Sequence, residues 1–230
     1  MILLALDTAL GACSACLFDM ESREVLARAV EPMDKGHAER LMPMVAEMAG
    51  QAGISPQACG RFVATVGPGS FTGLRVALSA ARAMATVTGG EVVGVSTLSA
   101  LAAPWLAQGA AIAVAIDARH DHVYCALVDA AGRALAEPAY RSARDFAELA
   151  AATPSRLVGS GAALVTAQWP KWAAAAVATD PSGYPDIEWV ARLGAAADPA
   201  LAPPLPLYLK PPDAKPQEAL PHLRLRGAAP

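Results

Sequence analysis

The sequence predicts an α/β protein built from two similar lobes, and three observations lead to this fold class. The chain of 230 residues is 54% hydrophobic and 17% charged, which is typical of a folded protein with a sizeable core. A strand–turn–strand pattern occurs twice, and similar elements follow each copy in the same order. We therefore expect an N-terminal lobe over 1–110, a smaller C-terminal lobe over 111–210, and a proline-rich, mobile tail over 211–230.

Each copy of the repeat begins with a predicted β-hairpin. Leu4–Thr8 leads through a short turn to Ala15–Asp19, and Val114–Ala118 leads through a similar turn to Cys125–Asp129 with the same spacing. In both copies the first strand is apolar and ends in an aspartate, which is a common turn residue.

The elements that follow the two hairpins also correspond. In the first copy we expect a helix over 37–50, a strand over Phe62–Val66 and a long alanine-rich helix over Ser70–Thr86. In the second copy we expect a helix over Arg144–Ala151, then a short strand and a glycine turn. This common order predicts two lobes of the same topology around a cleft.

Composition and charge exclude several classes of protein. A net charge of −3 offers no general surface for a phosphate backbone. The uncharged stretch Val92–Ile116 contains polar residues and a proline, so we expect a strand, a helix and a strand rather than a membrane span. Cys13 and Cys16 should point to opposite faces of one strand as small buried residues. With no basic N-terminal leader, these features predict a cytoplasmic protein.

The segment Gly67–Arg75 follows a strand and opens a helix, which is a geometry that binds anions. It lacks the lysine of a phosphate-binding P-loop, and Pro68 breaks the pattern of a nucleophile elbow. Two interpretations stay open: contact with a nucleotide such as ATP or ADP at a shared interface, or close packing of the backbone. Under the first, the contacting residues would be Asp7, Thr8, Gly67, Gly69, Ser70 and Asp117.

The two long helices of the first lobe carry apolar stripes rich in methionine, beside polar positions on the second helix. Ordinary core packing accounts for part of both stripes, and an adaptable docking face is the alternative. The predicted interface residues are Leu41, Met44, Met48, Phe71, Leu74, Arg75, Leu78 and Arg82.

The duplicated plan resembles the actin/hexokinase/Hsp70-like ATPase superfamily, and particular motifs resemble one family within it. Ile2–Ala9, His37–Met44, Gly67–Arg75 and Gly94–Leu98 are similar to the TsaB family of bacterial tRNA threonylcarbamoyladenosine biosynthesis proteins, a glycoprotease-like group. Asp117–Arg119 and Tyr208–Lys210 fit the same pattern.

The resemblance implies a subunit that supports catalysis elsewhere. The related catalytic subunit, TsaD, holds a metal through a His-x-x-x-His pair, and Thr97 and Leu101 stand at those positions here. Neither is a strong ligand for a transition metal. The implied role is a scaffold without a metal or cofactor that binds TsaD, helps recruit the ATPase TsaE and contacts tRNA only indirectly. Two copies would pair when TsaD is absent.

Two enzymatic alternatives remain at this point. Asp7 and Asp117 could serve a stand-alone ATP-dependent phosphotransferase or hydrolase. Ser70 could serve a peptidase acting on TsaD, although no His/Asp pair can be assigned to it. His120 and His122 lie in the second hairpin turn, where a solvated turn is expected rather than a metal site.

Overall fold

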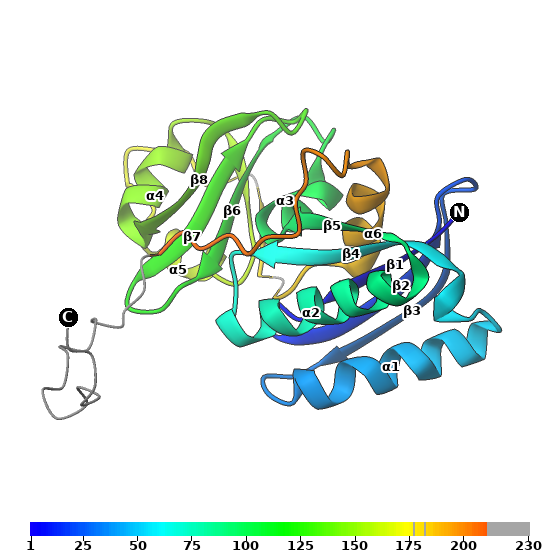
Figure 1. Ribbon diagram of the computed structural model, residues 1–230. Coiled ribbons are helices and arrows are strands. Elements are labelled where there is room, and N and C mark those ends of the chain that lie inside the picture. The colour runs from blue at the N-terminus through cyan, green and yellow to red at the C-terminus, as the bar shows by residue number, and fades with distance from the viewer. Residues whose placement is uncertain (177, 182, 211–230) are drawn as a thin grey trace, which may run out of the picture.

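A computed structural model, which describes residues 1–176, 178–181 and 183–210, shows two five-stranded mixed sheets side by side (Figure 1). Both sheets have the same strand order, so the predicted duplication and the two-lobed α/β architecture are confirmed. The first sheet, in spatial order, is β3 (Glu24–Pro32), β2 (Ala12–Asp19), β1 (Ile2–Asp7), β4 (Cys59–Gly67) and β5 (Glu91–Ser96). The second is β8 (Ala134–Ser142), β7 (His122–Val128), β6 (Ala111–Asp117), β9 (Ser155–Val158) and β10 (Ala178–Asp180).

The repeated hairpins form the centre of each sheet. Strand β1 pairs antiparallel with β2 and parallel with β4, and β6 pairs in the same two ways with β7 and β9. Both predicted hairpins are therefore correct. The strands β3 and β8, which extend each hairpin into a third strand, were not predicted. All residues of both strands are exposed or half-buried, so neither strand carries the run of buried apolar residues that marks the central strands.

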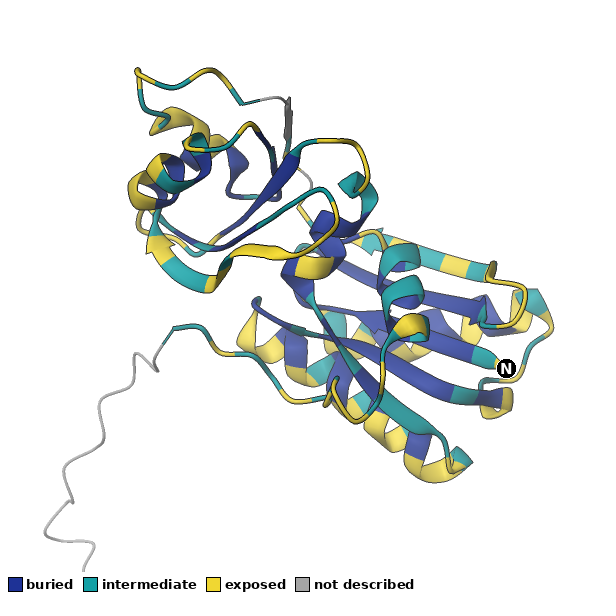
Figure 2. Cartoon of the chain, turned by 90° about the horizontal axis from the view of Figure 1, so that it is seen from above, coloured by how far each residue is buried: buried dark blue, intermediate teal, exposed yellow. Residues whose placement is uncertain are grey.

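Helices lie on both faces of the first sheet and on both faces of the second. The long helices α1 (His37–Ala52) and α2 (Phe71–Thr88) lie on one face of the first sheet, and α6 (Ile187–Ala196) lies on the other. The second sheet carries α4 (Ala143–Ala151) and α5 (Ala162–Ala167) on its outer face. The short α3 (Thr97–Ala102) packs between the lobes, and the 3₁₀ turns η1 (Pro56–Ala58) and η2 (Ala103–Trp105) complete the elements. Figure 2 shows the burial concentrated in the central strands.

The predicted extent of the second lobe was wrong at its C-terminal end. The second sheet does begin at Ala111, but α6 returns to the first sheet, where Ile187 and Val190 pack in the same cluster as Leu3 and Val63. The physical reason is that the first sheet has two apolar faces, and α1 and α2 cover only one of them. The proline-rich segment 211–230 lies outside the described residues.

The cysteines and the uncharged stretch behave as expected. Cys13 packs in the cluster beneath α1 and α2, whereas Cys16 packs beneath α6 on the opposite face. Burial raises the pKa of the Cys16 thiol to about 12, so it stays protonated. The stretch Val92–Ile116 contains most of β5, all of α3 and most of β6. In the described part of the chain, no helix combines the length and apolar character that a bilayer crossing requires.

The start of α2 packs directly against the turn after β1. A Cβ atom added to Gly73 would lie 1.9 Å from the carbonyl oxygen of Thr8, and one added to Gly69 would lie 2.5 Å from that of Ala9. The Thr8 hydroxyl donates a 2.6 Å hydrogen bond to the carbonyl of Gly73, and the Ser70 amide donates to the carbonyl of Ala9 at 2.8 Å. These glycines permit a backbone contact that any side chain would prevent.

We predict that Gly73→Ala destabilises the fold by about 2–4 kcal/mol, because the new methyl group displaces α2 from the β1 turn. The matched control is Gly50→Ala in α1, where an added Cβ has no atom within 4 Å. Alanine there should raise stability by about 0.5–1 kcal/mol through helix propensity. Urea denaturation of both variants measures the difference, and equal stabilities would contradict the packing described here.

Candidate functional site

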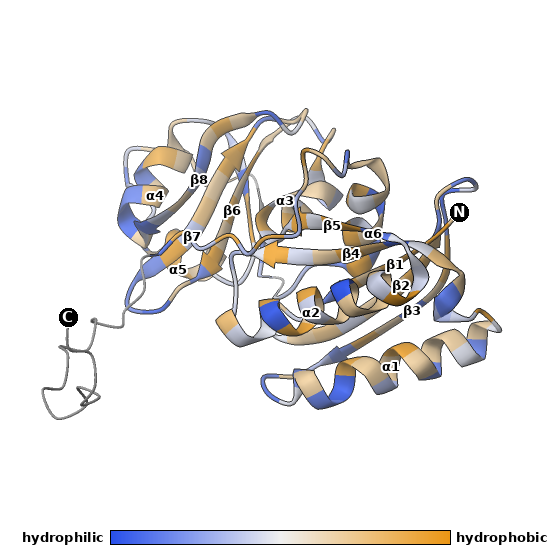
Figure 3. Cartoon of the chain, viewed as in Figure 1, coloured by the Kyte–Doolittle hydropathy of each residue, from blue (hydrophilic) through white to orange (hydrophobic). Residues whose placement is uncertain are grey.

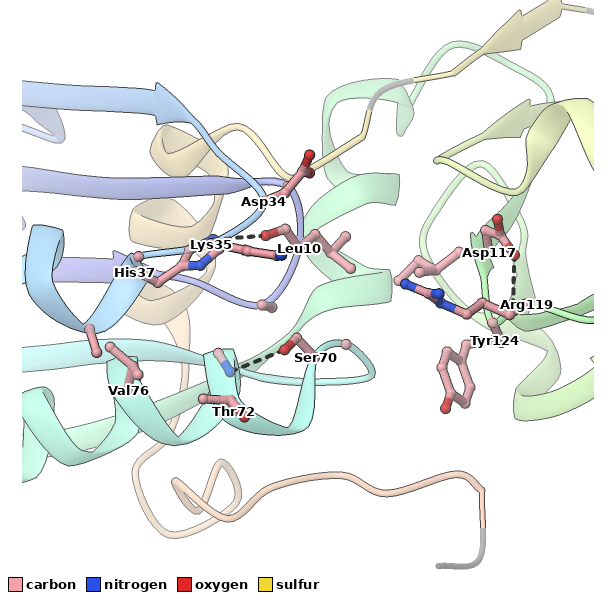
Figure 4. A pocket seen from close by; sticks show the side chains of 18 of the residues that line it. Leu10, Asp34, Lys35, His37, Ser70, Thr72, Val76, Asp117, Arg119 and Tyr124 are labelled. Carbon is pink, nitrogen blue, oxygen red and sulfur yellow. Dashed lines mark hydrogen bonds between the residues drawn. The ribbon is translucent and has the colours of Figure 1, made fainter. Parts of the chain in front are cut away.

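An open cavity of about 680 Å³ lies between the lobes. Its first wall is formed by the β1–β2 turn, the segment before α1 and the start of α2, and its second wall by the β6–β7 turn (Figure 4). The first wall supplies Lys35, His37 and Ser70, and the second supplies Arg119 and Tyr124. The side chains of Lys35 and Arg119 extend toward the cavity from opposite lobes. Sequence analysis did not single out Lys35 or Tyr124, because neither belongs to a recognisable motif.

Asp7 and Thr8, two of the predicted nucleotide contacts, do not line this cavity. Both are fully buried. One carboxylate oxygen of Asp7 accepts hydrogen bonds from the Thr65 hydroxyl and the Ala9 amide, and the Thr8 hydroxyl bonds to Gly73. In this structure their polar atoms connect β1 to its neighbours, and neither side chain is open to the cavity.

Part of the glycine loop packs within the fold, and part of it faces the cavity. A Cβ on Gly67 would lie 3.0 Å from the carbonyl oxygen of Leu207, so this glycine is covered by the C-terminal segment and does not line the cavity. Gly69 and Ser70 do line it. The Ser70 hydroxyl accepts a 3.2 Å hydrogen bond from the Gly73 amide as the N-cap of α2. This gives Ser70 a structural role that needs no nucleophilic chemistry.

Asp117 reaches the cavity from the second lobe and is exposed. Its carboxylate accepts a 2.7 Å hydrogen bond from the Arg119 amide, and Arg119, His120 and Asp121 all have positive φ. The cavity also carries the carboxylates of Asp34 and Glu39, so charges of both signs surround it. The structure thus brings Gly69, Ser70 and Asp117 to one cavity and leaves the other three predicted contacts outside it.

The positions of a TsaD-type metal pair do not fit a metal here. Thr97 and Leu101 are both buried on α3, and Leu101 packs in the apolar cluster between α3 and the second sheet. A leucine offers no donor atom, and a lone threonine hydroxyl is a poor ligand for transition metals. Throughout the described residues, no three His, Cys, Asp or Glu side chains gather as potential metal ligands.

A second concave surface, which we call the docking groove, runs between α1 and α2. Its volume is about 650 Å³, and apolar side chains dominate its lining. Met42 is 47% exposed and Phe71 is 55% exposed, although both are large and apolar. Figure 3 shows hydrophobic residues along both helices. The groove is lined by Ala38, Leu41, Met42, Phe71, Thr72, Arg75, Val76, Ser79, Ala80, Ala83 and Met84.

Five of the eight predicted interface residues are in fact core residues. Each is at most 4% exposed: Leu41, Met44, Met48, Leu74 and Leu78. Four of them belong to the core cluster between their helices and the first sheet, whereas Leu74 lies beside Gly67. Leu41 alone of these also touches the floor of the groove. The stripe with the strongest helical periodicity faces the sheet, which is its ordinary destination. Phe71, Arg75 and Arg82 are exposed as predicted.

The sequence does contain apolar residues that form the exposed docking groove, but they lie beside the apolar stripes that face the sheet. Met42 sits beside the buried Leu41, and Ala80, Ala83 and Met84 flank the buried Ala81. A helix that is apolar beyond its buried stripe exposes the remainder unless a partner covers it.

Comparisons with known proteins identify the family to which the chain belongs. A family model described as TsaD, tRNA N6-adenosine threonylcarbamoyltransferase, matches residues 24–170. The chain belongs to this family. Within the TsaD family it is TsaB-like: the Escherichia coli tRNA threonylcarbamoyladenosine biosynthesis protein TsaB is 37% identical over 128 residues, which cover 55% of this chain and 54% of that protein. The match therefore spans about half the length of that relative.

Three longer matches extend the family relationship to nearly the whole chain. An uncharacterized protein of Mycobacterium bovis is 34% identical over 215 residues, 93% of each chain. The solved structure of YeaZ from Pseudomonas aeruginosa is 31% identical with a TM-score of 0.75, covering 90% of this TsaD-family chain and 99% of that one. Another solved Pseudomonas aeruginosa protein, described as similar to peptidase YeaZ, matches equally well, at 31% identity and a TM-score of 0.75 over 91% of this chain and 99% of that one.

Burial of Asp7 has a consequence for stability. The desolvation raises its pKa above the usual 3.8, although hydrogen bonds from Thr65 and Ala9 and the charge of His37 act in the opposite direction. Its second carboxylate oxygen and the hydroxyl of its cross-strand neighbour Ser14 find no hydrogen-bond partner among the described residues. The native state therefore binds a proton at Asp7 more tightly than the unfolded state does.

We predict that Asp7→Asn stabilises the fold near neutral pH. The stability that the raised pKa contributes is present below the unfolded value of 3.8 and is lost as the pH rises through the folded value. Asparagine keeps the oxygen that accepts from Thr65 and Ala9 but carries no charge. The gain in free energy of unfolding should be largest near neutral pH and should shrink toward pH ~4. Thermal unfolding across this range tests it, and a variant less stable than wild type at neutral pH would contradict the assignment.

Proposed function

We propose that this chain is a non-catalytic subunit of the assembly that makes threonylcarbamoyladenosine in tRNA, and that it binds the catalytic TsaD-type subunit through the docking groove. The observation that carries the proposal is the exposed apolar surface of α1 and α2 in a chain of this family. Apolar surface of this kind on a folded lobe commonly marks a protein interface. The similarity to relatives named tRNA threonylcarbamoyladenosine biosynthesis protein TsaB supports a role in that biosynthesis.

The charges of α2 indicate what kind of surface the partner presents. This helix contains Arg75 and Arg82 on its exposed side and no aspartate or glutamate. The Arg75 guanidinium lies 3.7 Å from the centre of the Phe71 ring, which keeps a cation at the edge of the groove. A complementary partner would therefore offer an apolar helical face with carboxylates beside it.

The residues at the metal positions support a role without transfer chemistry. A TsaD-type centre requires two imidazoles, and Thr97 and Leu101 supply none. The proposed role needs no cofactor in this chain. In it, the tRNA contacts the catalytic subunit and reaches this chain only indirectly. We further infer that TsaE joins the same assembly in the cytoplasm, and that two copies pair through the docking groove when TsaD is absent.

The proposal predicts that Met42→Asp and Ala83→Asp each weaken binding to the TsaD-type subunit of the same organism by at least about tenfold. Both residues line the docking groove at exposed positions, so a carboxylate there is desolvated by the partner without disturbing the core. Isothermal titration calorimetry on the purified full chains measures the affinity. Denaturation curves confirm that each variant is folded.

The matched control is Leu135→Asp, which changes a 52% exposed leucine on β8 of the second lobe. It should bind as tightly as wild type. Wild-type affinity in both groove variants would refute the groove as the binding surface. Release of phosphate from MgATP by the isolated chain, abolished by Asp117→Asn, would instead favour a stand-alone enzyme.

A further inference from the structure

Residues 201–210, which we call the strap, run as an extended segment from the end of α6 across β5 and β4 toward the second lobe (Figures 1 and 2). Within it, residues Leu205–Lys210 belong to no helix or strand. In Figure 1 the helix α2 lies between the strap and α1. The strap therefore borders the side of α2 opposite the docking groove.

The first lobe is shaped to hold the strap. The Gly94 amide donates to the carbonyl of Ala202 at 3.0 Å, and the Leu207 amide donates to the carbonyl of Val66 at 2.7 Å. A Cβ on Gly94 would lie 2.6 Å from the carbonyl oxygen of Pro203. Gly67 lies under Leu207 and also has a φ of +107°, so only glycine suits this position without strain. The Arg82 side chain donates a hydrogen bond to the carbonyl of Pro204.

The end of the strap is anchored on the second lobe. Leu209 packs against the cluster that contains Ile112 and Val114 of β6. The Lys210 ammonium lies 5.7 Å from the centre of the Tyr140 ring on β8. The strap thus contacts both lobes, and its position depends on how they are oriented.

Large apolar side chains on the strap nevertheless point outward. Leu201 is 82% exposed, Leu205 is 62% exposed and Tyr208 is 49% exposed. The Tyr208 ring lies 5.6 Å from the ring of Phe71, which itself lines the docking groove. Through Phe71 the outward row of the strap is continuous with the groove, and Arg75 and Arg82 emerge from the helix between them.

We propose that the outward row Leu201, Leu205 and Tyr208 is a second part of the docking surface and is covered by the same TsaD-type catalytic subunit. The inference rests on the proposed function and adds a contact that α1 and α2 alone do not supply. Two apolar strips separated by arginines fit one partner face with carboxylates between apolar side chains. A second copy of this chain fits less well, because its α2 presents the same two arginines and no acid. Binding would also hold the strap in place and thereby fix the orientation of the lobes.

Titration of the full-length chain with the TsaD-type subunit tests the inference. Leu205→Asp and Tyr208→Ala should each weaken binding by about tenfold, because both remove apolar contacts from an outward position. Their denaturation midpoints should stay at the wild-type value, since neither side chain belongs to a core cluster. Leu135→Asp again serves as the exposed-leucine control.

The outcomes separate this inference from the proposed function. If Met42→Asp weakens binding and both strap variants bind within about twofold of wild type, the strap inference is overturned and the docking groove stands. If neither the groove variants nor the strap variants change the affinity, both proposals are overturned. Loss of binding in both sets, with Leu135→Asp unchanged, supports a single surface that spans α2.

Discussion

The close packing of α2 against the turn after β1 positions every feature to which we assign a function. At Gly73 the helix backbone approaches Thr8 more closely than any other residue would allow, and the Thr8 hydroxyl bonds to that same glycine. This contact sets the height of α2 above the sheet. The docking groove, the exposed Phe71 and the two arginines of α2 all follow from where the helix begins.

The same constraint also engages the polar groups around the glycine loop. A phosphate-binding loop needs free amides and polar side chains directed at the ligand. Here the Ser70 amide bonds to Ala9, the Ser70 hydroxyl caps α2, and Asp7 is buried against Thr65. The polar groups that could have served a nucleotide instead join the first strand, the loop and the helix. The apolar surface of α1 and α2, by contrast, stays exposed.

Much of the fold could be predicted because the two hairpins and α2 carry strong periodic signals. The strands β3 and β8 could not, since their half-exposed residues do not alternate clearly between apolar and polar types. The return of α6 to the first lobe depends on long-range packing between Ile187 and the strands β1 and β4, which no local pattern encodes. The sequence repeat therefore predicted the two sheets correctly but did not predict that the chain returns to the first lobe at α6.

The candidate site was predicted only in outline, for a similar reason. Spacing located both helices correctly, but it could not distinguish Leu74, which is buried, from Phe71, which is exposed three residues earlier. The role of Gly67 and Gly94 as the seat of the strap requires contacts with residues more than a hundred positions away. Such contacts become visible only in three dimensions.

The most direct test of the account is hydrogen–deuterium exchange of the full chain with and without the TsaD-type subunit. Our interpretation predicts slower exchange in α1, in α2 and in residues 201–210, with β8 unchanged. Protection confined to the second lobe, or none at all upon mixing, would contradict the claim that this fold holds a partner through its first-lobe helices.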